Sequence, residues 1–193
     1  MEIQSLTKLI AKFRSLPGVG AKTATRYAFS IIEGDKQNAN EFASAIVEAS
    51  ENIHFCKECG NFTDKDICDI CKTRSKDTIC VVAEPKDIIA FEKMGTYNGV
   101  YHCLHGTIDF QKGIGAEDIR IKELLSRLSG VKEIIIATNP DITGELTATY
   151  LSNQIKPLGI KVSRLAYGIS IGSEIEFADE LTLQRALQDR REI

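Results

Sequence analysis

Apolar residues recur at helical spacing through the first third of the chain. The first stretch ends before Pro17, a second runs over residues 21–32, and a third over residues 39–55. A Pro- and Gly-containing segment separates the first two stretches, and Gly34-Asp35 separates the second from the third. The pattern therefore predicts two helices joined by a tight turn, followed by a third helix.

After Thr78 the pattern changes to short β-prone runs that alternate with amphipathic stretches. The runs cover residues 79–83, 100–104, 134–138 and 160–165, and predicted helices over 87–94, 117–128 and 144–154 follow the first three. Such alternation predicts a parallel sheet covered by helices on both faces. The fold class is therefore a multi-module α plus α/β protein. Its working loops are expected beyond the carboxyl ends of the strands, at 84–87, 105–115 and 139–145.

Composition and charge add limits to this picture. The 193 residues are 43% apolar, which is enough for a buried core, and no apolar stretch approaches the roughly 20 residues of a membrane span. The N-terminus does not resemble a targeting peptide, so we expect a cytoplasmic, nucleoid-associated protein without membrane contact. The net charge of −3 argues mildly against DNA binding. The distribution of charge argues for it, because residues 8–26 hold five cations and no acid: Lys8, Lys12, Arg14, Lys22 and Arg26.

The turn between the first two helices has the composition of a phosphate-binding hairpin. Pro17 ends the first helix, while Gly18 and Gly20 leave no side chain between the backbone and an approaching ligand. Free N–H groups at the start of the second helix favour an anion, and Lys22 and Arg26 share one face of that helix. This favours a helix-hairpin-helix that holds nucleic-acid backbones without reading bases. The alternative is a plain αα-hairpin whose glycines serve only its turn.

Four cysteines predict a metal site. Cys56 and Cys59 form one Cys-x2-Cys pair, and Cys68 and Cys71 form another eight residues later. Two such pairs can close around one structural Zn²⁺ with no open position for catalysis. The alternative is two disulfides or free thiols, which this cysteine usage in a reducing cytosol disfavours. Cys80 and Cys103 lie in apolar runs and are expected in the core.

Acidic residues follow two of the predicted strands. Glu84 and Asp87 come after the first strand, and Asp141 and Glu145 after the third. Carboxylates at neighbouring strand ends could hold Mg²⁺ for phosphodiester chemistry. The alternative is that these acids cap helices. His102 and His105 flank a strand end, and we expect surface or structural roles for both because no partner ligands are spaced for them.

The order of these modules resembles the RecR family of bacterial recombination mediators. The resemblance runs from Leu6 to Arg191, and its most specific strings are LPGVGAKTATRYAF, CKEC and CDIC, ATNPDITGELTATYL, and GISIGSEIEFADELTLQRAL with RRE. It implies a helix-hairpin-helix over 1–55, a four-cysteine zinc finger over 56–77, a Toprim-like domain over 78–166 and an oligomerisation segment over 167–193.

The resemblance also implies a function. RecR-like proteins are non-enzymatic repair factors that form dimers or ring-shaped tetramers around DNA, single- or double-stranded. They work with RecO and RecF to load RecA onto single-stranded DNA. The family pattern assigns DNA contact to Lys22 and Arg26, zinc to the four cysteines, and RecO contact to the region of Asp87, Asp141 and Glu145.

Two positions depart from the family pattern. The glutamate that ends the first Toprim strand falls on Ala83, with Glu84 one position later, and Thr143 replaces a further glutamate. A shift of one position turns a strand side chain to the opposite face, so two carboxylates are lost from the pocket. This argues against Mg²⁺ binding and for a clamp, and it weakens the assignment of RecO contacts to this patch. An enzyme and a scaffold that binds only protein remain as rival hypotheses.

Overall fold

The computed structural model describes residues 3–166, 168–190 and 192. Tyr167, Arg191 and Ile193, which belong to the predicted oligomerisation segment, lie outside the described residues. The chain divides into two compact units, Met1–Ile53 and His54–Ile193.

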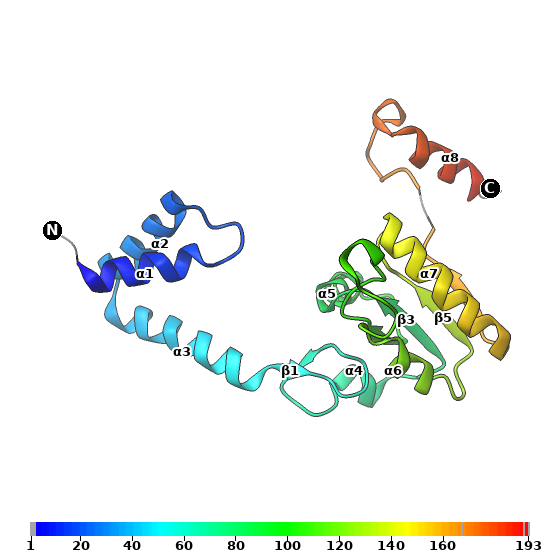
Figure 1. Cartoon of the computed structure of the whole chain (residues 1–193), viewed down its shortest axis with the longest axis horizontal. Helices are drawn as coiled ribbons and strands as arrows, with labels where there is room; N and C mark the ends of the chain where they lie inside the picture. The colour runs from blue at the N-terminus through cyan, green and yellow to red at the C-terminus, as the bar shows by residue number, and fades with distance from the viewer. Residues whose placement is uncertain (1–2, 167, 191, 193) are drawn as a thin grey trace. The chain divides into compact units, whose positions relative to one another are not determined.

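Three helices make up the first unit: α1 (Gln4–Arg14), α2 (Ala21–Glu33) and α3 (Lys36–Asn52). Figure 1 shows α1 and α2 lying side by side. Ala24 and Ala28 lie one turn apart on α2 and are fully buried, so their small side chains let α1 approach closely. The rings of Phe13 and Tyr27 meet edge to face with centroids 5.7 Å apart. The two predicted helices and the turn between them are therefore present.

The third helix differs from its predicted range of 39–55. Asp35 caps its start, because the carboxylate accepts a hydrogen bond from the Gln37 amide (3.2 Å). The helix ends before Ile53, and β1 (His54–Phe55) pairs antiparallel with β2 (Phe62–Thr63). Helical spacing alone could not show that Phe55 pairs with a residue beyond the first cysteine pair.

Four strands form a parallel sheet in the second unit, in the order β4 (Val100–Cys103), β3 (Thr78–Val82), β5 (Glu133–Ile136) and β6 (Lys161–Arg164). Every neighbouring pair is parallel, with Ile79 beside both Val100 and Ile134, and Ile136 beside Arg164. The four predicted strands are confirmed: β3 has the length of its predicted run but begins one residue earlier, and the other three are slightly shorter than their runs.

Helices cover both faces of this sheet. Alternate strand residues such as Ile79 and Ile134 pack with Leu151 of α7 (Ile142–Ile155) and with α6 (Ile121–Ser126). The residues between them, including Cys80, pack with Ile88 of α5 (Pro85–Met94) on the opposite face. Cys80 and Cys103 are buried in this second cluster, as predicted.

The helix α6 is shorter than the predicted 117–128. The Arg120 amide donates to the Leu104 carbonyl (2.9 Å), and Arg120 has a non-helical backbone (φ −74°, ψ 41°). The residues before Ile121 are thus tied to the end of β4 and cannot join the helix.

Short elements complete the second unit. They are α4 (Asp69–Thr73), η1 (Phe110–Lys112), η2 (Lys156–Leu158), η3 (Ile175–Phe177) and α8 (Glu180–Gln188). The described residues after 166 add no strand to the sheet. None of the described helices combines the length and the apolar character needed to cross a bilayer.

Candidate nucleic-acid interface and zinc site

The turn between α1 and α2 presents bare backbone. Gly18 has φ 78°, a left-handed conformation that favours glycine, and it lets the Val19 amide bond the Leu16 carbonyl (3.2 Å). Gly20 occupies the N-cap of α2 and supplies no side-chain cap. A Cβ atom at either glycine would meet no other atom within 4 Å, so the space in front of the turn is open. The first amides of α2 can therefore reach a phosphate oxygen.

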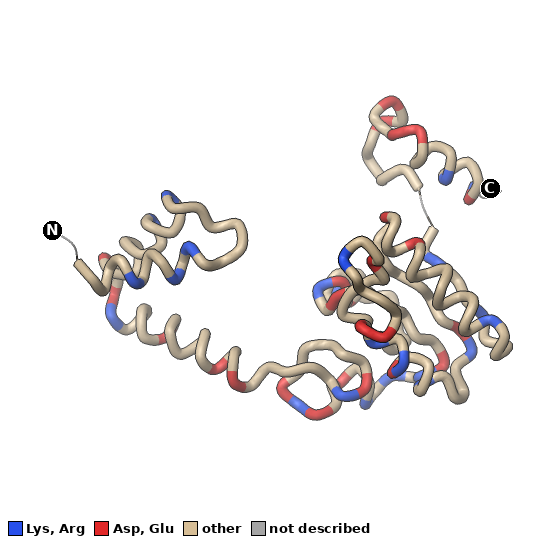
Figure 2. Tube along the Cα trace, in the orientation of Figure 1, with Lys and Arg blue, Asp and Glu red and all other residues tan. Residues whose placement is uncertain are grey.

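Lys22 and Arg26 extend from α2 beside this turn, and both are exposed. They are one helical turn apart and so share a face, and the Arg26 guanidinium also lies 5.7 Å from the centre of the Tyr27 ring. Figure 2 shows further cations on α1 and no acid along the two helices between residues 8 and 26. One turn and the helix that follows it thus hold the predicted residues Gly18, Gly20, Lys22 and Arg26. The two cations can neutralise phosphate groups, which carry no base identity.

The four cysteines of the two pairs converge. Cys56, Cys59, Cys68 and Cys71 are all buried, and their sulfur atoms lie within 4.8 Å of one another. The sulfurs of Cys59 and Cys68 are 3.6 Å apart. A tetrahedral Zn²⁺ with bonds of about 2.3 Å places its sulfur ligands roughly 3.8 Å apart. The cluster therefore fits one zinc ion, and none of the six cysteines of the chain, all of which the structure describes, forms a disulfide.

Backbone amides point at the sulfur atoms. The Asn61 amide donates to Cys59 Sγ (3.4 Å) and the Cys68 amide donates to Cys56 Sγ (3.3 Å). Hydrogen bonding with Cys68 raises the pKa of the Cys59 thiol to about 12, and hydrogen bonding with Cys59 raises the pKa of Cys71. Four thiols this close cannot all ionise alone, whereas a bound dication stabilises all four thiolates.

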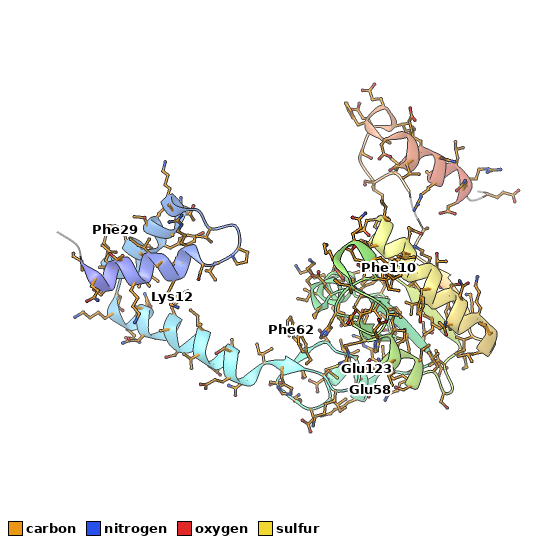
Figure 3. The ribbon with its side chains drawn as sticks, in the orientation of Figure 1. Lys12, Phe29, Glu58, Phe62, Phe110 and Glu123 are labelled. Atoms are coloured by element: carbon orange, nitrogen blue, oxygen red, sulfur yellow. The ribbon has the colours of Figure 1, made fainter. Side chains whose placement is uncertain are left out.

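The zinc module is bonded to the sheet. The Cys103 amide at the end of β4 donates to the Cys59 carbonyl (2.7 Å), and His105 Nε2 donates to the Gly60 carbonyl (2.7 Å). Arg127 Nη2 lies 3.3 Å from a carboxylate oxygen of Glu58, a residue that Figure 3 labels. Metal ligation in the module therefore also holds the end of β4 in place.

The buried His102 contacts Arg127, the residue that reaches Glu58 of the zinc module. Its Nε2 lies 2.7 Å from the Arg120 carbonyl, and its Nδ1 lies 2.9 Å from Arg127 Nη1. Because a carbonyl only accepts and a guanidinium only donates, His102 is the neutral tautomer with its proton on Nε2. Burial lowers the pKa of His102 to about 3. Both His102 and His105 therefore have a structural role, one of the two roles expected from the sequence.

The acids at the strand ends are engaged in local structure. Glu84 and Asp87 form a capping box at the start of α5, and the Asp141 carboxylate accepts from the Gly144 amide (2.7 Å). Glu145 in the first turn of α7 pairs with two arginines. Among the described residues, only the four cysteines form a group of three or more His, Cys, Asp or Glu side chains close enough to hold a metal ion. The Toprim-like domain implies Mg²⁺, but Asp87, Asp141 and Glu145 do not form a site that fits it.

The two arginines beside Glu145 were not identified as functional residues from the sequence. Arg164 ends β6 and Arg185 lies on α8, and both reach the same carboxylate oxygen of Glu145, at 2.9 and 3.3 Å. One signal was available: Arg164 is a charged residue at the carboxyl end of a β-prone run, where working residues of parallel sheets gather. No sequence signal pairs Arg185 with Glu145.

Four family models match successive parts of the chain. They are the RecR helix-hairpin-helix over residues 6–50, the RecR four-cysteine zinc finger domain over 53–72, the Toprim domain over 77–166, and the RecR C-terminal model over 168–191. The zinc-finger match and the four-cysteine cluster together assign one structural zinc ion to the chain. The three RecR-specific matches support a role in recombinational repair, DNA binding and oligomerisation. Together the matches span nearly the whole sequence in the order of its modules, and the chain belongs to the RecR family.

Proposed function

We propose that the chain is a recombination mediator that grips the DNA backbone as an oligomeric clamp and catalyses no reaction. The observation that carries this proposal is the α1–α2 turn. There, bare amides and the exposed Lys22 and Arg26 lie together in an acid-free stretch. These groups recognise phosphate, which single- and double-stranded DNA share.

Self-association supplies what one hairpin lacks. A single hairpin makes few phosphate contacts and so binds weakly at physiological salt. In an oligomer, DNA held by one hairpin meets the other hairpins at a raised effective concentration.

The first unit has an apolar face that another copy of the chain could cover. A groove of about 360 Å³ is lined there by Phe13, Leu16, Tyr27, Ser30, Ile31 and Phe42. Only Ala24 and Ala28 are buried among the described residues of this unit, too few for a core that is stable alone. A dimer or a ring-shaped tetramer is the proposed assembly.

The proposed partners are RecO and RecF, with loading of RecA onto single-stranded DNA as the outcome. Asp87, Asp141 and Glu145 are the proposed RecO contacts. The charge of Glu145 is balanced by Arg164 and Arg185. A basic partner would therefore be attracted mainly by Asp141, which is exposed, and by Asp87.

A role without catalysis is supported by the state of the Toprim acids. Glu84, Asp87 and Asp141 are engaged in helix capping, and Ala83 and Thr143 stand where the family pattern has glutamates. Metal-assisted phosphodiester chemistry needs carboxylates that are available to a cation.

The test is the double variant Lys22→Ala with Arg26→Ala. We expect it to fold, to bind zinc and to assemble normally, because both side chains are exposed. Its affinity for DNA should fall by about tenfold or more, and the slope of log affinity against log salt should fall by about two for each engaged hairpin. Fluorescence anisotropy with labelled single- and double-stranded DNA over a salt series measures both.

A matched control is Lys122→Ala with Lys156→Ala, which removes the same charge from exposed positions in the second unit. This control should keep most of the affinity. Equal losses in the two double variants, or full binding by the hairpin variant, would remove the hairpin from the mechanism.

A further inference from the structure

A set of oxygen atoms converges where β5 meets α7. It comprises the Thr138 hydroxyl, the carbonyls of Thr138 and Asn139, and the carboxylate of Glu145. Oxygen atoms of these kinds are the ligands that Mg²⁺ prefers. The position is also the carboxyl edge of a parallel sheet, where ligands of open α/β sheets bind.

One side chain reaches all four groups. Arg164 Nη1 donates to Thr138 Oγ1 (2.8 Å), and Nη2 donates to the carbonyls of Thr138 (3.3 Å) and Asn139 (3.2 Å). Its Nε and Nη2 both donate to Glu145 Oε1, at 3.2 and 2.9 Å. The guanidinium thus bonds the acceptors that a metal ion would bind, and it is only 19% exposed.

The register of the sheet puts Arg164 there. Ile136 of β5 lies beside Arg164 of β6, so the arginine leaves the sheet next to the last residue of the strand that carries the loop. On α7, Gly144 lets the loop pack tightly, because a Cβ atom there would lie 2.0 Å from the Asn139 carbonyl oxygen. The loop carbonyls are therefore held in place against the guanidinium.

A second cation adds to the first. Arg185 Nη1 of α8 lies 3.3 Å from Glu145 Oε1, so the single negative charge of Glu145 meets two positive charges. A dication placed at this carboxylate would be repelled by both guanidinium groups.

We propose that Arg164 takes the place of a divalent metal ion among the oxygen atoms of Thr138, Asn139 and Glu145 in the Toprim-like domain. Arg185 uses the same carboxylate to anchor the C-terminal segment. Arg164 is in this view a positioning residue: it closes the site to metal ions and fixes the β5–α7 loop. The proposal is independent of DNA binding by the hairpin.

The test compares Mn²⁺ binding by four zinc-loaded, full-length proteins. They are the wild type, Arg164→Gln, Thr143→Glu, and Thr143→Glu with Arg164→Gln. Thr143→Glu restores a carboxylate to the loop, and electron paramagnetic resonance counts free and bound Mn²⁺ directly. We expect no Mn²⁺ binding at this site in the wild type and at least about tenfold tighter binding by the double variant than by Thr143→Glu alone. Glu145→Gln in the double-variant background should abolish the gain.

Lys161→Ser is the matched control, since it removes a cation from the opposite end of β6 and should leave Mn²⁺ binding unchanged. Equal Mn²⁺ affinity with and without Arg164 would overturn the proposal. If the Arg164 variants do not fold, the effect of Mg²⁺ on the melting temperature of the wild type still tests the proposal. Mg²⁺ should not raise its melting temperature above that in NaCl of equal ionic strength. A rise that Glu145→Gln abolishes would show that a metal ion, not Arg164, fills the site.

Discussion

The two compact units treat their charged groups in opposite ways. In the first unit, Lys22 and Arg26 are exposed and meet no carboxylate among the described residues. In the second, the acids at the strand ends are bonded to arginines, lysines or backbone amides. The ion pairs found among the described residues all lie in this second unit. A charge that is balanced inside the molecule is less available to a ligand. The contrast therefore supports the proposal that the first unit recognises phosphate, while the paired charges of the second unit stabilise its structure.

The largest effect should come from the zinc site. Cys68→Ser removes a ligand from a site whose metal binding contributes on the order of 10 kcal/mol to folding. We expect loss of bound zinc and faster hydrogen exchange at the Cys103 amide, because its acceptor, the Cys59 carbonyl, is no longer held. Zinc analysis and hydrogen exchange measure the two effects.

Cys80→Ala is the control for this variant, since Cys80 is buried in the sheet and not in the cysteine cluster. It should retain one zinc ion per chain. Protection of the Cys103 amide in zinc-free Cys68→Ser would show that the metal does not support the second unit.

The next largest effect should come from a glycine substitution, whose cost in stability should differ between the two units. Gly144→Ala forces a Cβ atom to within 2.0 Å of the Asn139 carbonyl oxygen unless the backbone moves. We expect a loss of about 3 kcal/mol in the free energy of unfolding of the second unit, as for a strongly overpacked position. The same change at Gly20 meets open space at φ −78°, so it should leave stability nearly unchanged. Denaturant unfolding measures both, and equal losses would contradict the tight packing of the β5–α7 loop.

Acid should weaken the second unit through His102. Burial lowers the pKa of His102 from 6.5 to about 3, so its contribution is fully present above pH 6.5 and is lost as the pH falls toward the folded value. Between pH 6.5 and 5 the expected loss is about 2 kcal/mol. Protonation of Nδ1 would also break the bond from Arg127.

The measurement is denaturant unfolding across this pH range with the zinc content determined at each point, so that acid release of the metal is scored separately. His102→Asn should be less stable at neutral pH and show a shallower dependence on pH. An unchanged dependence in that variant would rule out His102 as its source.

Much of the fold could be predicted because its signals are local. Helical spacing placed α1 and α2, and the β-prone runs placed all four strands of the sheet. The cysteine pairs likewise predicted the metal site, since metal ligation imposes a spacing that sequence displays directly.

What could not be predicted depends on contacts between distant residues. The start of α6 is set by a hydrogen bond from the Arg120 amide to the Leu104 carbonyl, 16 positions earlier in the chain. The Arg185–Glu145 pair joins residues 40 positions apart and leaves no periodic pattern. The sequence identified the acids as a candidate metal site or as caps, and only the three-dimensional arrangement shows which cations surround them.

Photo-crosslinking of the assembled protein to bromouracil-substituted DNA tests the central proposal most directly. The crosslinked peptides can be mapped by mass spectrometry in the wild type and in Lys22→Ala with Arg26→Ala. We expect crosslinks over residues 16–29 in the wild type and their loss in the double variant. Crosslinks confined to residues 54–193, unchanged by the double variant, would contradict it.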